Sequence, residues 1–323
     1  MTPLYLFSLP RSGSTLLQRL LAGHPSIATA SEPWILLPLA GMVAGSGIRS
    51  YAEYSQRGAC IAIEDLAARM PNGARDFEDA VRGFTLDVYR RAAGGETAYF
   101  LDKTPRYFLI IDFVLRVFPD AKAIVLLRNP LDVLSSVITT WGGDRLWLHN
   151  ALLDLYRGPC AIHEALTQRP DRFLTVRYEH LVSDPEGICR RVCEHLGLEY
   201  DVRMLDGDAV AADSGRLGDK SANLSGSSVV QSSVNRWHEV LNTPVRRHFA
   251  RRYLRRLGRE TCATFGLDQA ATLAELDRLK LRWDGVGADA SALVLSFLGP
   301  LLASTTVRDL WRRRGTLPIP KID

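Results

Sequence analysis

The chain has 323 residues, of which 46% are hydrophobic and 24% are charged. These are ordinary values for a globular protein, so they exclude a fibrous, collagen-like or wholly disordered chain and leave enough apolar material for a large core. The formal net charge is +4, and only five of the 40 basic residues are Lys. This mild excess does not indicate nucleic-acid binding, but it suits a small anionic ligand because the arginine fork matches phosphate oxygens.

In chain order, the hydrophobic pattern predicts strands that alternate with helices. The apolar run Leu4–Leu9 ends at Pro10 and is typical of a buried strand, and leucines at helical spacing then predict a helix over Ser14–Ala22. Further apolar runs predict three more strands, at 98–101, 121–127 and 173–178. Helical patterns lie between and after them, at 107–118, 129–139, 146–167, 185–196, 244–265 and 267–283. The alternation predicts an α/β fold with a mainly parallel central sheet and helices on both faces.

Two stretches interrupt this alternation. Residues 34–97 contain helical patterns but no comparable strand, and we interpret them as a helical insertion. Gly, Ser, Asp and Ala dominate residues 205–235, which predicts either a lid-like loop or a disordered one. We therefore predict a domain over 1–265 that includes both stretches, followed by a helical extension over 266–323 that packs on this domain.

The turn Pro10–Thr15, after the first strand, has the composition of an anion-binding loop. Gly13 lies between a buried strand and a helix N-terminus, where backbone N–H groups converge and the helix dipole is positive. Arg11 adds a charge, and Ser14 and Thr15 add hydroxyl donors. A Walker A loop would need a second Gly followed by Lys and Ser or Thr, which weighs against an ATPase or an ordinary kinase. The alternative is a tight turn without a ligand.

A second candidate anion site follows the strand at 121–127. Arg128 stands at the end of this strand, and Asn129-Pro130 is a strong start signal for the next helix. Ser136 lies eight residues after Arg128, about two turns into that helix. Two anion sites on one sheet suggest a ligand with phosphates at both ends of a nucleoside.

With both sites, the sequence resembles the sulfotransferases that use PAPS, 3′-phosphoadenosine 5′-phosphosulfate. Its motifs resemble those of the branch that contains the tyrosylprotein sulfotransferases and the bacterial carrier-protein and glycan sulfotransferases. Three further segments agree with the family in the correct order, namely Leu101–Pro105, Val176–Pro185 and Asn235–Trp237. The resemblance is discontinuous but ordered, and it extends from about Leu4 to Tyr253. It implies the P-loop-type, three-layer form of the α/β fold.

The resemblance also implies residue roles. It assigns the 5′-phosphosulfate to the loop residues Arg11, Ser12, Gly13, Ser14 and Thr15. It assigns the 3′-phosphate to Arg128 and Ser136, and further nucleotide contacts to Tyr178 and Arg236. The alternative for Tyr178 is that it simply ends a strand.

The implied reaction moves a sulfuryl group from PAPS to an acceptor hydroxyl and releases adenosine 3′,5′-bisphosphate, without a metal. Negative charge grows on the oxygen that bridges to the leaving phosphate, so Lys103 and Arg11 are the candidates for stabilising it. Glu32 stands where tyrosylprotein sulfotransferases carry their catalytic Glu, and we expect it to be the base. The alternative for Glu32 is a structural hydrogen-bond acceptor.

Two other functions stay open. One is a P-loop kinase-like phosphotransferase, and the other is a non-catalytic nucleotide-binding or membrane-peripheral adaptor. The adaptor hypothesis rests on residues 290–314, where an apolar run precedes Arg308 and Arg312-Arg313-Arg314, a combination that suits an anionic membrane surface. The alternative is a helix packed on the domain with a solvated basic end.

The cysteines bear on compartment and on metal binding. Five scattered cysteines and an N-terminus without a signal-peptide pattern favour the cytoplasm. Cys189, Cys193 and His195 have helical spacing, which we interpret as core packing because no fourth ligand is near. We expect the acceptor hydroxyl on a glycan, a lipid or lipid-linked sugar, a natural product or a carrier-bound acyl chain, and neither its identity nor an oligomeric state follows from the sequence.

Overall fold

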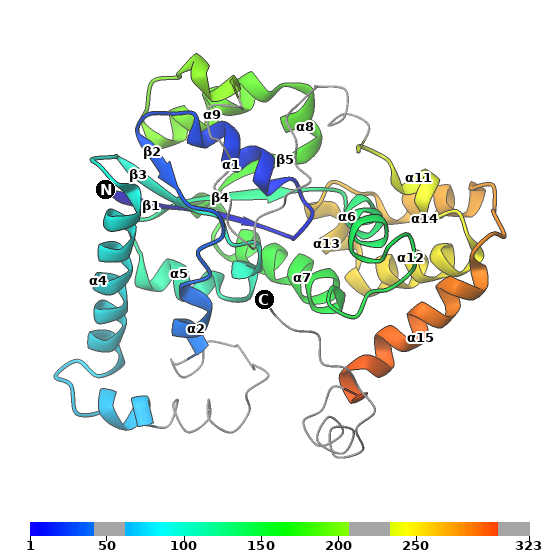
Figure 1. Cartoon of the computed structure of the whole chain (residues 1–323), viewed down its shortest axis with the longest axis horizontal. Coiled ribbons are helices and arrows are strands. Elements are labelled where there is room, and N and C mark those ends of the chain that lie inside the picture. Colours follow the sequence, from blue (N-terminus) through cyan, green and yellow to red (C-terminus); the bar gives the residue numbers. More distant parts are fainter. Residues whose placement is uncertain (42–61, 207–232, 303–323) are drawn as a thin grey trace.

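The computed structural model describes residues 1–41, 62–206 and 233–302 and contains a five-stranded parallel sheet (Figure 1). In spatial order the strands are β2 (Ile27–Thr29), β3 (Tyr99–Asp102), β1 (Thr2–Ser8), β4 (Lys122–Leu127) and β5 (Leu174–Arg177). All four strand pairs are parallel, as the sequence predicts. The predicted count of four strands is wrong, because the sheet also contains β2. The sequence pattern does not reveal β2, which has only three residues, two of them partly exposed, and so carries no apolar run.

Helices surround this sheet. Those of the first half are α1 (Ser14–Ala22), α2 (Leu36–Gly41), α4 (Ala74–Ala93), α5 (Ile111–Val117), α6 (Pro130–Ser136) and α7 (Leu152–Gln168). Those of the second half are α8 (Tyr178–Ser183), α9 (Pro185–Leu196), α11 (Trp237–Val240), α12 (Pro244–Leu257), α13 (Arg259–Thr264), α14 (Gln269–Arg278) and α15 (Val286–Leu302). Residues 62–67 are also helical. Shorter 3₁₀ or π turns cover Pro105–Leu109, Val137–Trp141, Pro170–Arg172 and Val202–Leu205.

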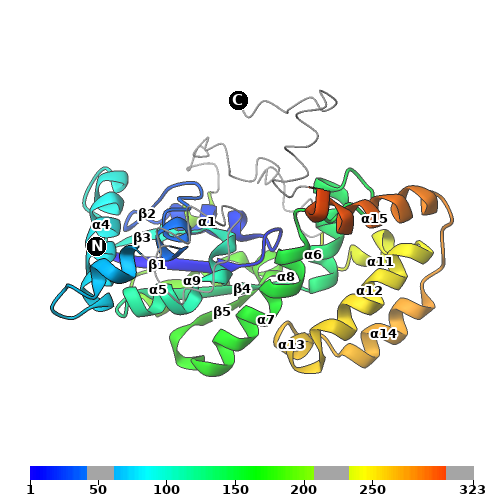
Figure 2. The same ribbon diagram turned by 90° about the horizontal axis from the view of Figure 1, so that it is seen from below.

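The sheet separates two apolar layers, which explains why β1 is apolar at almost every position. Leu4 and Leu6 point to the side covered by α1 and α9, whereas Tyr5 and Phe7 point to the side covered by α5 and α7 (Figures 1 and 2). All four side chains are buried. A parallel sheet with helices on both faces leaves no polar face on its central strand. The predicted three-layer α/β class is confirmed.

Several predicted helix bounds need correction. The helix predicted over 146–167 begins only at Leu152, and the residues before it lie against α15, where the backbone N–H groups of Leu146 and Leu148 donate to Asp289 and Ser296. The pattern at 107–118 divides into a 3₁₀ turn and α5, and the pattern at 244–265 divides at Gly258, whose φ is 83°.

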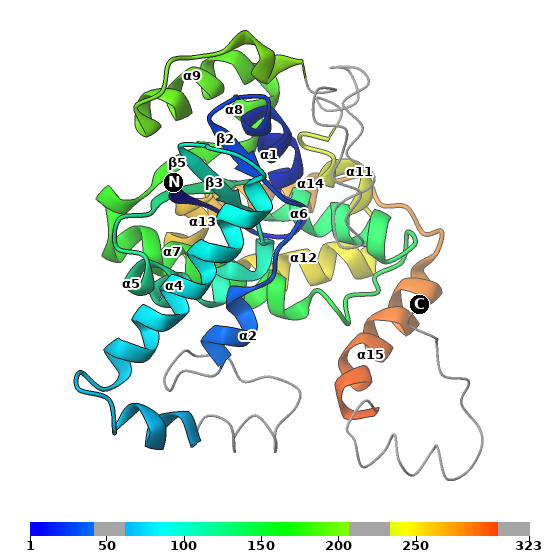
Figure 3. The same ribbon diagram turned by 60° about the vertical axis from the view of Figure 1, so that its left-hand side comes forward.

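The C-terminal helices continue the layer that α7 begins. Helix α12 packs against α7, α14 and α15, and Arg246 of α12 donates to Asp289 of α15 (Figures 1 and 3). Phe265 and Leu276 are buried in the same apolar cluster as the sheet. The division of the chain at residue 265 stays a proposal. Residues 207–232 of the loop predicted at 205–235, and residues 303–323 of the extension, lie outside the described residues.

Candidate active site

The loop between β1 and α1 has the backbone form of an anion cradle. Arg11 and Gly13 both have positive φ, at 67° and 87°. This conformation is accessible to glycine but strained for arginine, and such strain is concentrated at binding sites. The loop leads directly into the nine-residue helix α1. Because the first N–H groups of a helix have no partner within it, they face the loop as donors for an anion.

Gly13 is required for space as well as for conformation. A Cβ atom at this position would lie 2.4 Å from two ring carbons of Tyr178, so the loop backbone packs directly against that ring. Tyr178 does not end a strand, because β5 ends at Arg177 and Tyr178 begins α8. The Arg128 guanidinium carbon lies 4.2 Å from the centroid of the Tyr178 ring, on which it stacks.

The two anion sites predicted from sequence meet in space. Arg11 Nε donates to Ser136 Oγ at 3.1 Å, and Arg128 donates to the Arg11 carbonyl at 2.8 Å. Burial is the main cause that lowers the pKa of Arg128 from its ordinary value. Within the described residues, Arg128 Nε and Ser12 Oγ are buried without a hydrogen-bond partner. Such orphaned donors are rare in proteins, and a phosphate oxygen would satisfy them.

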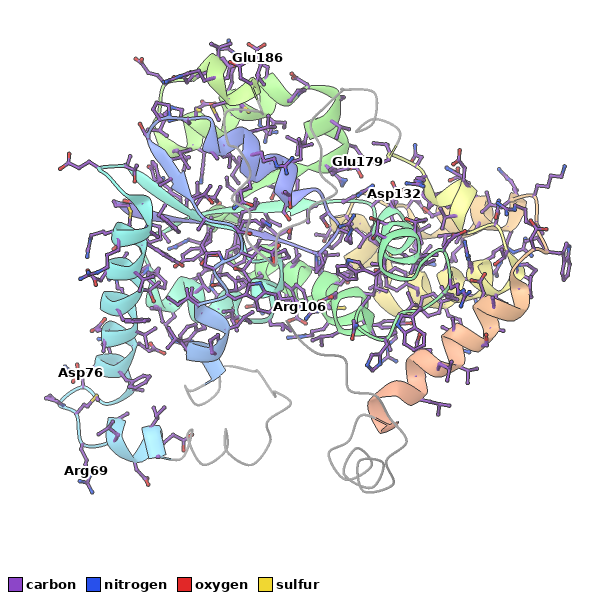
Figure 4. The ribbon with its side chains drawn as sticks, in the orientation of Figure 1. Arg69, Asp76, Arg106, Asp132, Glu179 and Glu186 are labelled. Carbon is purple, nitrogen blue, oxygen red and sulfur yellow. The ribbon has the colours of Figure 1, made fainter. Side chains whose placement is uncertain are left out.

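Asp132 connects this site to the segment that carries Arg236, and sequence reasoning missed it. Its two carboxylate oxygens accept the backbone N–H groups of Asn235, at 2.9 Å, and of Trp237, at 3.1 Å. Arg236 lies between these two anchored residues and is exposed. Burial raises the pKa of Asp132, and Arg128 opposes that rise. Figure 4 labels Asp132 on α6. The only sequence signal was its spacing, four residues from both Arg128 and Ser136.

Glu179 and Ser233 are further missed residues at this end of the site. Glu179, labelled in Figure 4 on α8, accepts the backbone N–H of Asn129 at 3.1 Å. The Ser233 carbonyl accepts from Arg128 at 2.7 Å, and its hydroxyl lies 2.5 Å from the Tyr178 hydroxyl. Residues 233–237 therefore close the site beside Arg128 and Tyr178.

Lys103 and Glu32 form a second cluster next to the loop. Lys103 is 1% exposed, and its Nζ donates to Glu32 Oε1 at 2.8 Å and to Thr15 Oγ1 at 3.5 Å. Glu32 is 11% exposed, and its other oxygen accepts from Trp34 Nε1 at 3.1 Å. A cation and a carboxylate that are paired and largely shielded from water lie beside the anion cradle, with Thr15 in common.

Five side chains at the site come from the carboxyl ends of all five strands. Glu32 follows β2, Lys103 follows β3, Arg11 follows β1, Arg128 follows β4 and Tyr178 follows β5. In open α/β sheets, ligands bind at this edge. The structure thus brings together the predicted loop, Arg128, Ser136 and Tyr178 at one end and Thr15, Lys103 and Glu32 at the other.

Cys189 and Cys193 are buried in the apolar layer between the sheet and α9. Among the residues that the structure describes, no three His, Cys, Asp or Glu side chains are grouped so that they could hold a metal ion.

Comparison with known proteins identifies the family. The model of the sulfotransferase family matches residues 3–202, which is more than half of the chain. The chain belongs to the sulfotransferase family. Of the residues placed at the candidate site, only Ser233 and residues 235–237 lie outside the matched range.

Two curated relatives and one solved structure are among the proteins to which the chain is similar. The chain is 33% identical over 226 residues to nodulation protein NoeE of Sinorhizobium fredii, a match that covers 61% of this chain and 50% of that relative. It therefore spans about half the length of NoeE. It is 23% identical to protein-tyrosine sulfotransferase 1 of Danio rerio over 76% of this chain and 68% of the relative. A sulfotransferase structure from Alicyclobacillus acidocaldarius aligns with 86% of this chain and 99% of its own, with 14% identity and a TM-score of 0.46.

Proposed function

We propose that this sulfotransferase-family chain transfers a sulfuryl group from PAPS to an acceptor hydroxyl and releases adenosine 3′,5′-bisphosphate. The observation that carries the proposal is the order of groups along the sheet edge. A buried, paired Lys103 and Glu32 lie beside an anion cradle, and a buried arginine site follows on the other side of that cradle. When bound, PAPS supplies the group that is transferred.

The cradle and the arginine site fit the two phosphate ends of this nucleotide. We assign the loop Arg11–Thr15 to the 5′-phosphosulfate, because it combines helix N–H groups with the orphaned Ser12 hydroxyl. We assign Arg128 and Ser136 to the 3′-phosphate, because Arg128 Nε is a buried donor without a partner in the described part of the chain. Tyr178 would border the nucleotide.

Arg236 belongs to this nucleotide site through the segment that holds it. Asp132 anchors the residues on either side of Arg236, and the Arg128 side chain donates to Ser233 in the same segment. We propose that Arg236 contacts the nucleotide from this segment. The lid-like role predicted for 205–235 is a proposal that concerns mainly residues outside the described ranges.

Lys103 and Glu32 are assigned to the chemistry. The Lys103 ammonium has three N–H groups, of which two are directed to Glu32 and Thr15, and the third is our candidate donor to the bridging oxygen of the leaving phosphate. Arg11 would share the developing charge. Glu32 would take the proton of the acceptor hydroxyl, and its contact with Lys103 holds it next to the cradle.

Calorimetry with adenosine 3′,5′-bisphosphate tests the nucleotide class. We expect the bisphosphate to bind and ATP with Mg²⁺ to bind much more weakly, because the arginine site is matched to a 3′-phosphate. Preferential binding of ATP would instead support the phosphotransferase alternative. Transfer of label from PAPS to a panel of glycans, hydroxylated lipids and natural products would then identify the acceptor class.

A peripheral membrane contact through residues 290–314 is a separate proposal, supported by the two faces of α15. Val294, Leu295, Phe297 and Leu298 are 43 to 57% exposed, whereas Ala292 and Ser296 are buried. The arginines at 308 and 312–314 follow in the sequence, outside the described residues. No helix in the described ranges is long and apolar enough to cross a membrane. Co-sedimentation with phosphatidylserine vesicles tests the contact, and loss of binding in Phe297→Ser would support it.

We propose a cytoplasmic location from the state of the cysteines. The four that lie in the described residues, Cys160, Cys189, Cys193 and Cys262, are free thiols. Free thiols persist in reducing compartments. Fractionation of the native host cell, with separate assay of soluble and membrane fractions, tests both this location and the membrane contact.

A further inference from the structure

Asp102 precedes Lys103 at the end of β3 and lies on the opposite side of the backbone from it. Successive side chains of a strand point to opposite faces, so Lys103 reaches Glu32 while Asp102 is directed into the core. Asp102 is fully buried and accepts hydrogen bonds from three hydroxyls, those of Tyr89, Thr104 and Tyr107. The proposed reaction gives this network no role.

Two of the three hydroxyls extend to the segment that follows Glu32. Thr104 Oγ1 donates to Asp102 Oδ1 at 3.0 Å and accepts the backbone N–H of Trp34 at 3.2 Å. Tyr107 Oη donates to Asp102 Oδ2 at 3.0 Å and accepts the backbone N–H of Leu36 at 3.1 Å. The carboxylate therefore holds two backbone amides of this segment through two hydroxyl relays.

The ionised state of Asp102 gives these relays a direction. A carboxylate only accepts hydrogen bonds, so each hydroxyl must use its single proton on Asp102 and present its lone pairs to a backbone N–H. Burial raises the pKa of Asp102 to about 6, and the three hydroxyls oppose that rise. Asp102 is thus ionised at neutral pH, where the orientation of both hydroxyls is fixed.

Trp34 connects the relays to Glu32. Its backbone has a φ of 56°, a strained conformation for a non-glycine residue that persists only where surrounding contacts impose it. The bond from Trp34 N–H to Thr104 is such a contact. The indole Nε1 of Trp34 then donates to Glu32 Oε2, while Lys103 occupies Glu32 Oε1. One carboxylate oxygen of Glu32 is therefore bonded by Lys103, and the other by Trp34, whose backbone the Thr104 relay holds.

We propose that Asp102, Thr104 and Tyr107 are positioning residues, which hold residues 34–36 so that Glu32 is presented to Lys103. This inference rests on the proposed role of Glu32 as the base. It goes beyond that role because it assigns control of the base to a buried network that touches neither substrate.

Tyr89 provides a matched control within the same network. Its hydroxyl donates to Asp102 Oδ2 at 2.5 Å, and its ring is buried like that of Tyr107, but no bond joins it to Trp34 or Leu36 in the described structure. Tyr89→Phe and Tyr107→Phe each remove one hydroxyl from the same carboxylate oxygen. Only Tyr107→Phe also removes the acceptor of the Leu36 N–H.

Hydrogen exchange of the ligand-free protein gives the first readout. We expect peptides covering residues 31–37 to lose protection in Tyr107→Phe and to keep it in Tyr89→Phe. Thr104→Val, which removes a hydroxyl with little change in shape, should also lose protection, and Thr104→Ser should restore it. Equal exchange of these peptides in Tyr89→Phe and Tyr107→Phe would overturn the inference. Thr104 and Tyr107 accept from different backbone amides. The Thr104 variants therefore still decide the question if the tyrosine variants do not fold, and the tyrosine variants decide it if the Thr104 variants do not.

Kinetics give the second readout. Misplacement of the base should lower kcat roughly 10- to 100-fold in Tyr107→Phe and Thr104→Val without raising KM for PAPS, and Thr104→Ser should recover kcat. Tyr89→Phe should retain kcat. Equal loss of kcat in the two tyrosine variants would show that the network supports only the core, and would overturn the inference. A wild-type protein that transfers no sulfuryl group would count against the proposed function, while the exchange measurement would still decide whether the network positions residues 31–37.

Discussion

Replacement of Asp102 by Asn should change how stability depends on pH. Burial raises the pKa of Asp102 from 3.8 in the unfolded chain to about 6 in the folded protein. As pH rises, the unfolded chain ionises at this position first, so the folded state loses stability between the two values. At roughly 1.4 kcal/mol per pKa unit, the full loss is about 3 kcal/mol. Asn at this position cannot ionise, and the variant should lack this component.

The assay is urea unfolding of wild type and Asp102→Asn at pH 4.5 and pH 7.5. The free energy of unfolding of wild type, relative to the variant, should fall by about 2 kcal/mol between these values, because part of the titration lies below pH 4.5. Other groups titrate alike in both proteins and cancel in the comparison. The Asn amide also changes the hydrogen bonds to the three hydroxyls. This alters the difference in unfolding free energy between the two proteins by a constant amount and does not alter how that difference varies with pH. A difference that stays constant from pH 4.5 to 7.5 would refute the buried, titrating carboxylate.

Four substitutions at the site have expected outcomes of their own. Lys103→Ala should abolish turnover while calorimetry still detects adenosine 3′,5′-bisphosphate; unchanged turnover would remove Lys103 from the chemistry. Glu32→Gln should lower kcat by roughly 10²- to 10⁴-fold, as expected for loss of a general base, with little change in bisphosphate affinity, and a loss confined to affinity would contradict that role. Arg128→Ala should cost about 2 kcal/mol in binding of the bisphosphate but little in binding of adenosine 5′-phosphosulfate, which lacks the 3′-phosphate; equal losses in two parallel titrations would mean that Arg128 does not contact that phosphate. Gly13→Ala should weaken both nucleotides, because its methyl group would collide with the Tyr178 ring and the residue has positive φ; full affinity in the variant would show that the loop tolerates another form.

Local signals made part of this site predictable from sequence. Asn129 caps α6 as expected, with its side chain accepting from the Leu131 N–H, and Pro130 takes the first helical position. Helix α1 spans the predicted residues, with the glycine-bearing loop before it. Caps, turns and apolar periodicity act within a few residues, so they are legible in one sequence.

Tertiary hydrogen bonds account for what the sequence concealed. The N–H of Leu146 donates to Asp289, 143 residues away, and nothing near Leu146 in the sequence indicates this contact. Asp132 has an ordinary position inside a helix, and its two bonds to residues 235 and 237 depend on a segment over 100 residues further on. The network of Asp102 likewise combines residues from β3, α4 and the turn after β3 with the chain that follows Glu32.

The order of the site residues in space follows from strand order and not from sequence order. Along the chain the five residues occur as Arg11, Glu32, Lys103, Arg128 and Tyr178, but the sheet order β2-β3-β1-β4-β5 places them as Glu32, Lys103, Arg11, Arg128 and Tyr178. Neighbouring strands lie about 4.8 Å apart, so the ends of β3 and β4 are separated by about 10 Å, with the β1 loop between them. Lys103, at the end of β3, therefore lies one strand away from the β1 loop. Arg128, at the end of β4, lies one strand away from the same loop in the opposite direction. A ligand that joins all three must carry negative charge at two separated points. In the proposed reaction, such a ligand would leave the Lys103 side, where Glu32 stands, as the place at which an acceptor meets the sulfuryl group.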